Sequence, residues 1–236
     1  MNPGRVGRVV FEDRLSYEGR EKRARAGRSG EVPGEDLGRI ISLSDGVFAF
    51  ALTLLVLSLT VPTLVTANTS SSVVSSNLAR ALQSDWQKFF GYAFAFVMIG
   101  IWWVIHHRTF RYIQRYDWVL MWLNMIVLLE VAVMPFVLSV YTTYSDAQVA
   151  VALFASMQVV IGLTMNALWR YASRGHRLID PKLKVEEIRY YANRGLLTPI
   201  AFGVSIAISF VSVPWAQYVW FIPLLLSRLS HKYGVD

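Results

Sequence analysis

One long apolar run near the start of the chain constrains its fold more than any other feature. Residues 39–62 open with a group of polar side chains, continue as Val-Phe-Ala-Phe-Ala-Leu-Thr-Leu-Leu-Val-Leu, and end at Pro62. A helix of about 20 apolar residues crosses the ~30 Å hydrocarbon core of a bilayer. Only helices and closed barrels satisfy their backbone polar groups there. The run therefore predicts a first transmembrane helix with a polar cluster at its start.

Further apolar segments follow the first. Three are continuous runs at Trp86–Ile105, Trp118–Tyr141 and Val149–Trp169. The last segment, Gly195–Leu229, would be ~52 Å long as one helix at 1.5 Å per residue, which exceeds one bilayer. We expect it to fold back at Pro214 into a fifth and a sixth span. The sequence predicts an all-α, polytopic membrane protein with six transmembrane helices.

Composition and charge agree with a multi-span membrane protein. The chain is 54% hydrophobic, which is high for a soluble domain. A net charge of +7 would suggest nucleic acid as the partner of a soluble protein. Here 21 of the 23 Lys and Arg lie in the N-terminal segment through Arg39, in residues 106–117 and 170–194, and near the C-terminus. By the positive-inside rule both termini are cytoplasmic, so we expect a multi-pass plasma-membrane protein that binds no nucleic acid.

The charge pattern also suggests how the chain is divided. Residues 1–38 hold eight Lys and Arg and seven Asp and Glu, so we expect a mobile cytoplasmic tail. Residues 39–230 form the six-helix transmembrane domain, and residues 231–236 form a cytoplasmic C-terminal tail. Residues 63–84, rich in Ser, Thr and Asn, are expected to be the longest loop on the opposite side.

The first helix carries a stripe that has no charge. At 3.6 residues per turn, one face collects Gly46, Phe50, Thr53, Leu57 and Thr60. Several copies of this helix around an axis would enclose a narrow apolar pore with a hydroxyl layer at Thr53, and apolar constrictions gate by dewetting. The alternative is that the stripe packs against a neighbouring helix and that Thr53 bonds to a carbonyl of its own helix.

Polar residues of the first and second helices meet the cytoplasmic membrane boundary. They are Arg39, Ser44, Asp45, His106 and His107. A carboxylate at the edge of hydrocarbon is costly unless it is paired, and the histidines are the obvious donors. The group predicts a polar clamp between two helices, or a proton-sensitive support for a gate, because histidine titrates near neutral pH. Adjacent helical residues point apart, so we expect no metal site.

Glu130 is a lone carboxylate in the middle of the third span. Such a residue is a functional candidate by default. It could bind a proton or cation in a transporter, or it could be protonated or hydrogen-bonded to a neighbouring helix. Gly-x-Ser-x-Gly, His-Glu-x-x-His and P-loop motifs are missing from the sequence, and there are no cysteines. We therefore expect neither an enzyme nor a bound cofactor.

Several motifs resemble one known family. Arg39-x-x-x-Leu43-Ser44-Asp45 resembles the Arg-x-x-x-Phe-Ser-Asp signature of the transmembrane protein 175 family of potassium channels. The apolar run that follows is similar to that family's first helix. Further resemblances, to the His-His-x-x-Phe pattern of its second helix and to its third helix, involve His106, His107, Phe110, Asp117, Leu123, Asn124, Pro135 and Phe136. The resemblance is strongest over residues 39–140.

The resemblance implies a homotetramer in the lipid bilayer that conducts potassium ions passively. Helix 1 of each copy would line a pore on the tetramer axis. By position, Phe50, Leu54 and Leu57 correspond to the family's constriction, and Thr53 corresponds to its hydroxyl layer. Asn124 would join the polar clamp. Phe50 replaces the family's usual isoleucine or leucine, so a phenyl ring would narrow the constriction.

Other classes of membrane protein remain open. A secondary transporter would use Glu130 as its coupling carboxylate, although no inverted repeat is visible among the spans. A non-conducting membrane scaffold is a third possibility. A voltage-gated channel is disfavoured because the fourth span has no repeated arginines, and no Thr-Val-Gly-Tyr-Gly filter is present.

Overall fold

A computed structural model describes residues 35–59, 61–63 and 70–223 of the chain. Within these ranges every regular element is a helix, apart from one isolated antiparallel bridge between Ile113 and Ile179. Residues 1–34 of the predicted N-terminal tail, the predicted C-terminal tail and positions 224–229 of the last apolar segment lie outside the described residues. Residues 35–38, predicted to belong to the N-terminal tail, instead form the start of the first helix.

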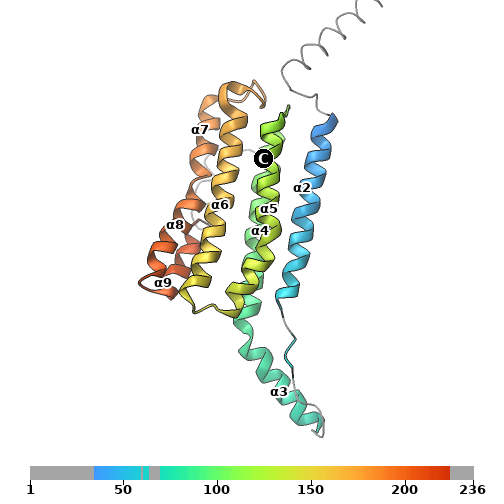
Figure 1. Ribbon diagram of the computed structural model, residues 1–236, viewed down its shortest axis with the longest axis vertical. Coiled ribbons are helices and arrows are strands. Elements are labelled where there is room, and N and C mark those ends of the chain that lie inside the picture. Colours follow the sequence, from blue (N-terminus) through green and yellow to red (C-terminus); the bar gives the residue numbers. More distant parts are fainter. Residues whose placement is uncertain (1–34, 60, 64–69, 224–236) are drawn as a thin grey trace, which may run out of the picture.

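Four long helices form the body of the molecule (Figure 1). They are α2 at Glu35–Leu54, α4 at Trp86–Tyr112, α5 at Trp118–Thr143 and α6 at Gln148–Ser173. A 3-10 turn, η1 at Leu55–Ser58, continues α2. In the described part of the chain these four are the helices that are long and apolar enough to cross a membrane. They coincide with the first four predicted spans, although α2 begins four residues before position 39.

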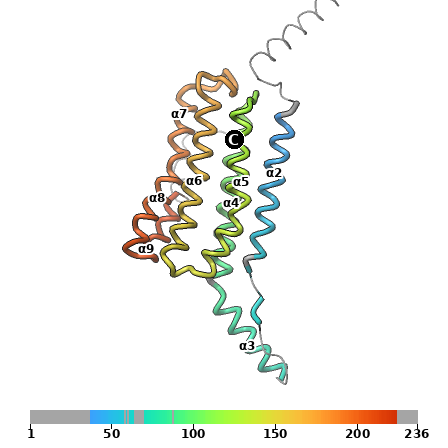
Figure 2. Tube along the Cα trace, in the orientation of Figure 1, coloured from blue at the N-terminus to red at the C-terminus, as the bar shows by residue number. Residues whose placement is uncertain are grey.

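The last apolar segment is built from shorter helices. Helices α7 at Val185–Arg194 and α8 at Leu197–Ser209 lie end to end beside α6, and Figure 2 traces the same path. The chain then turns back into α9 at Val213–Tyr218 and η3 at Val219–Phe221. At 13 residues, α8 is ~20 Å long, less than a bilayer core.

The predicted reversal near Pro214 is present. Pro214 lies in the first turn of α9, where its missing backbone N–H removes no helical hydrogen bond. Two hydrogen bonds hold α9 and η3 against α8: the Ser205 hydroxyl donates to the Ala216 carbonyl over 2.8 Å, and the Trp220 indole N–H donates to Ser205 Oγ over 2.7 Å. The second half of this hairpin leaves the described residues after Pro223.

The loop predicted for residues 63–84 is wrong in its second half. Residues 71–84 form helix α3 (Ser71–Ser84), none of whose side chains is buried. Figures 1 and 2 show α3 beyond the end of the four-helix body, next to the start of α4. The serine content suggested a loop, but Val74, Leu78 and Leu82 recur every four residues, which is a helical spacing.

An aromatic core holds α4, α5 and α6 against the C-terminal hairpin. Trp220 of η3 lies at its centre, with ring centroids 4.9 Å from Phe154 and 5.3 Å from Tyr141. Phe94 and Phe202 stack on the same indole at 5.6 and 5.8 Å. Between membrane helices such rings stabilise the fold by van der Waals packing, because lipid tails are as apolar as the core. These contacts give a rigid body against which α2 packs with one face only.

Candidate functional site

Helix α2 has one buried face and one open face. Phe48, Ala51 and Leu55 are buried against the body of the molecule. The opposite face is defined by Gly46, Phe50, Thr53 and Leu57, all of which are exposed in the single chain. We call these four residues the open face of α2, with η1, to which Leu57 belongs, counted as its continuation.

The open face is too apolar to be left uncovered. The Phe50 and Leu57 side chains are 64% and 73% exposed. Large apolar side chains gathered on one exposed face mark a surface that meets lipid or another protein. Leu54, predicted to share this surface, is half-buried at its edge. Thr60 lies outside the described residues.

The hydroxyl of Thr53 is oriented by its own helix. Thr53 Oγ1 donates to the Phe50 carbonyl oxygen over 2.8 Å, as the alternative interpretation of this residue predicted. The bond uses the single hydroxyl proton and leaves the oxygen lone pairs free on the exposed side. An exposed hydroxyl oxygen of this kind is able to coordinate a cation through its lone pairs. The hydrogen bond within α2 and a role in ion binding are therefore compatible.

Three residues of the predicted clamp come together from three helices. Asn124 of α5 accepts at Oδ1 from His106 Nε2 of α4 over 2.8 Å. Its Nδ2 donates to Ser44 Oγ of α2 over 3.0 Å, and the Ser44 hydroxyl donates to the Ile40 carbonyl over 2.8 Å. An amide oxygen only accepts, so His106 Nε2 carries a proton. We call Ser44, His106 and Asn124 the polar triad.

The polar triad is sealed from solvent. Its members are each no more than 1% exposed. The His106 ring stacks on Phe110 with centroids 4.4 Å apart and lies 5.4 Å from the Phe48 ring. Burial without water makes each of these hydrogen bonds costly to lose. The triad thus fixes both the depth and the rotation of α2 relative to α4 and α5.

Asp45 is bound by a residue that the sequence analysis did not select. The indole N–H of Trp103 donates to Asp45 Oδ1 over 2.8 Å, and the His107 ring stacks on the same indole at 5.6 Å. The expectation that the histidines donate to Asp45 is therefore wrong for the described part of the chain. Asp45 lies about 100° around the helix from Ser44, so it faces Trp103 and His107 rather than His106.

Arg39 stands apart from the rest of the predicted clamp. Its side chain is exposed and makes no hydrogen bond or ion pair with another described residue. The six residues that separate it from Asp45 are more than a full turn and a half of helix. The structure therefore brings together five of the six predicted clamp residues, in two adjacent groups.

Glu130 faces α6 and not the open face of α2. The carboxyl group accepts a hydrogen bond at Oε1 from the Thr164 hydroxyl of α6 over 2.7 Å. Its side chain is 7% exposed. The hydrogen bond to a neighbouring helix, one of the possibilities that the sequence left open, is present.

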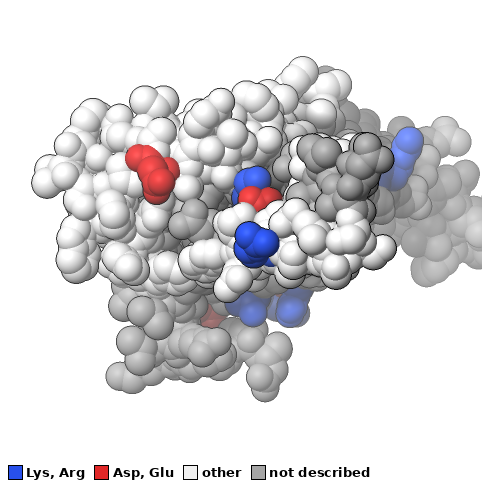
Figure 3. All heavy atoms as spheres, turned by 90° about the horizontal axis from the view of Figure 1, so that it is seen from below, with Lys and Arg blue, Asp and Glu red and all other residues white. Residues whose placement is uncertain are grey.

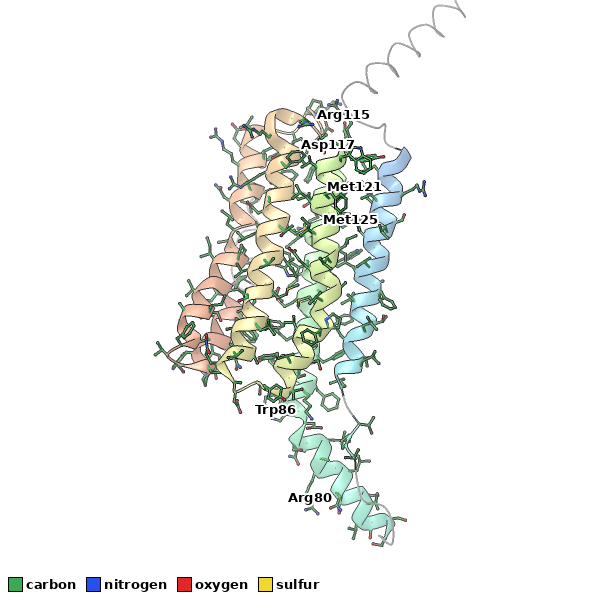
Figure 4. All side chains as sticks on the ribbon, in the orientation of Figure 1. Arg80, Trp86, Arg115, Asp117, Met121 and Met125 are labelled. Atoms are coloured by element: carbon green, nitrogen blue, oxygen red, sulfur yellow. The ribbon has the colours of Figure 1, made fainter. Side chains whose placement is uncertain are left out.

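Asp117 organises the N-terminal end of α5 and was missed as a site residue. It caps α5 by accepting from the Leu120 N–H over 2.9 Å, and its second oxygen accepts from the Tyr171 hydroxyl over 2.6 Å. Arg177 forms an ion pair with the same oxygen at 2.8 Å. Figure 4 shows Asp117 and Arg115 at the end of the body opposite Trp86 and Arg80. An aspartate directly before an apolar helix is a typical N-cap residue, and this pattern in the sequence could have identified Asp117.

Charge is distributed unequally between the two ends. The described surface at the α3 end carries few charged side chains (Figure 3). Arg80 and Lys88 are the basic residues of that part of the sequence, and Lys88 pairs with Asp85 at 2.9 Å. The opposite end carries the arginines and lysines of residues 108–115 and 170–194. This asymmetry agrees with the positive-inside argument.

Known proteins resemble this chain over most of its length. The family described as "Endosomal/lysosomal potassium channel TMEM175" matches residues 39–135. A potassium channel of Streptomyces collinus is 34% identical over 181 residues, 75% of this chain and 84% of that protein. A potassium channel of Chamaesiphon minutus is 32% identical over 190 residues, 79% of this chain and 91% of that protein.

A solved structure shares the fold. The crystal structure of a lysosomal potassium-selective channel TMEM175 homolog from Chamaesiphon minutus superposes with a TM-score of 0.69 at 29% sequence identity. The superposition covers 82% of this chain and 97% of that one. The residues that match the family, 39–135, include the open face of α2 and the polar triad.

Proposed function

The chain belongs to the TMEM175 family of potassium channels, and on that premise we propose that it is a potassium-selective cation channel with a pore lined by α2. The observation that carries the proposal is the open face of α2. This face is uncharged, exposes Phe50 and Leu57, and includes one hydroxyl layer at Thr53. Its opposite face is fixed to the body of the protein.

A single chain supplies one α2 and therefore cannot enclose a pore. We propose a homotetramer in which four copies of the open face surround the axis, because closed rotational symmetry repeats one surface around one channel. Phe50 and Leu57 form the apolar rings, with Leu54 at their margin. Thr53 forms a hydroxyl ring between them, with its oxygen lone pairs available to a partly dehydrated potassium ion.

The polar triad supports this pore from behind. It holds the cytoplasmic half of α2 to α4 and α5 through side chains that do not reach the open face. Asp45 and Trp103 add a second attachment one residue further around α2. The pore radius at Phe50 then depends on a helix that cannot rotate freely.

Ion flux from purified protein in liposomes tests the proposal. Vesicles with outward potassium gradients should show passive flux that follows the membrane potential and exceeds the flux driven by an equal sodium gradient. Saturable flux coupled to protons would instead indicate a secondary transporter. No flux under either gradient, from protein that is folded and inserted, would favour a scaffold. The transporter alternative also requires Glu130 to lie on the permeation path, whereas Glu130 contacts α6.

We propose six spans, with both termini on the cytoplasmic side of the plasma membrane. The proposal is supported by the charge asymmetry, by the four long apolar helices and by the reversal before α9. A reporter inserted at position 145, between α5 and α6, and a reporter fused after Asp236 should report opposite sides of the membrane. Both reporters on the same side would contradict the span count.

A further inference from the structure

Glu130 is a buried carboxyl group that ion conduction along α2 does not use. It lies in the apolar middle of α5, between the residues of the core that face α6. Its one hydrogen bond to a described residue comes from Thr164. A carboxyl group at this depth has to be neutral or to be compensated by a positive charge or by several donors.

The second oxygen of Glu130 has neither form of compensation. Oε2 is inaccessible and has no hydrogen-bond partner among the described residues. One further buried side-chain atom in the described part of the chain shares this condition, Gln158 Nε2, which belongs to an uncharged amide. An unpartnered neutral group costs a few kcal/mol, whereas an unpartnered charge costs far more. The cost of leaving Glu130 Oε2 unpartnered is therefore as small as the cost for Gln158 Nε2 only if the Glu130 carboxyl group is uncharged.

No charged side chain among the described residues faces Glu130 from the helices around it. On α6, Arg170 and Tyr171 lie six and seven residues beyond Thr164 towards the cytoplasmic end. On α2 and α4, Asp45 and His106 lie at the level of Asn124, which precedes Glu130 by six residues, or ~9 Å along α5. Tyr141 lies eleven residues further along α5, near the outer end. Thr164 is thus the polar partner that the described residues supply to Glu130.

We propose that Glu130 and Thr164 form an intramembrane proton-binding site that joins α5 to α6. The carboxyl group binds one proton and is neutral in the structure described here. Thr164 supplies its hydroxyl to one carboxyl oxygen, and the hydrocarbon core surrounds the other. Loss of the proton places an uncompensated negative charge between α5 and α6, so alkaline conditions weaken the packing of these two helices.

Infrared spectroscopy tests the protonation state directly. The difference spectrum between the wild-type protein and Glu130→Gln at neutral pH should contain the carbonyl stretch of a protonated carboxylic acid. The matched control is Glu186→Gln, at an exposed position of α7, whose difference spectrum should contain carboxylate bands. Carboxylate bands alone in the Glu130→Gln difference would overturn the proposal. The glutamine amide keeps the shape of the neutral acid, which preserves the packing of the variant.

The pH dependence of stability in detergent is the second measurement. The neutral form is favoured when the carboxyl group is buried, whereas water around an unfolded segment allows it to ionise, so rising pH favours unfolding. The melting temperature of wild type should therefore fall relative to Glu130→Gln as pH rises from below the ordinary pKa of a glutamate side chain into the alkaline range. A constant difference between the two proteins across that range would contradict the proposal. Both measurements are independent of ion flux, so their failure leaves the proposed channel function unaffected.

Discussion

Asn124→Leu should destabilise the folded protein by roughly 2–4 kcal/mol, because it removes the central member of the polar triad. Leucine has the same number of side-chain heavy atoms and the same branching at Cγ, so it keeps the shape of asparagine while adding some bulk. His106 Nε2 and the Ser44 hydroxyl oxygen both lose their partner on α5. Neither group has access to water, so the unpaired His106 donor carries a full desolvation penalty.

Thermal unfolding in detergent and the yield of assembled protein measure this effect. The control is Asn193→Ala at an exposed position of α7, which should change stability by less than about 0.5 kcal/mol. The double variant Asn124→Leu with His106→Phe removes donor and acceptor together, and the ring packs between Phe48 and Phe110 as before. It should recover part of the loss. Equal stability of Asn124→Leu and wild type would contradict the role of the triad.

Phe50→Ala should raise potassium current several-fold. The substitution removes the largest side chain of the open face, and dewetting of an apolar constriction depends on both its radius and its apolarity. Stability should change little, because Phe50 is exposed in the single chain. Single-channel or liposome currents measure the effect, with Ile126→Ala on the exposed face of α5 as the matched apolar control. A larger increase from Ile126→Ala than from Phe50→Ala would place the pore on another helix.

Thr53→Val should lower the preference of the channel for potassium over sodium. Valine keeps the shape of threonine and removes the exposed oxygen, while the lost bond to the Phe50 carbonyl is local to α2. A loss of about 1 kcal/mol in ion stabilisation corresponds to roughly fivefold in the permeability ratio. Reversal potentials under mixed potassium and sodium conditions measure it. An unchanged ratio, with current of normal size, would exclude Thr53 from ion selection.

Sequence and structure agree best on the properties that the bilayer dictates, namely the length of each helix and its apolar composition. Four long apolar runs became α2, α4, α5 and α6, since a backbone in hydrocarbon has to bond to itself and its length has to match the core thickness. The last apolar segment is too long for one crossing, and it reverses just before the helix that begins around Pro214. The period of 3.6 residues also separated the open face of α2 from Phe48, Ala51 and Leu55. These properties depend on local order in the chain.

Tertiary structure decided which polar groups meet. The sequence placed Asp45 near two histidines, but the rotation of α4 presents Trp103 to Asp45 and turns His106 towards Asn124. The serine-rich segment before α4 folded as α3, and Glu130 turned towards Thr164. Helix periodicity gives the relative angle of residues on one helix, whereas the rotation and depth of two helices against each other follow from the packing of all their side chains. That packing depends on the whole folded chain and cannot be read from any one segment of the sequence.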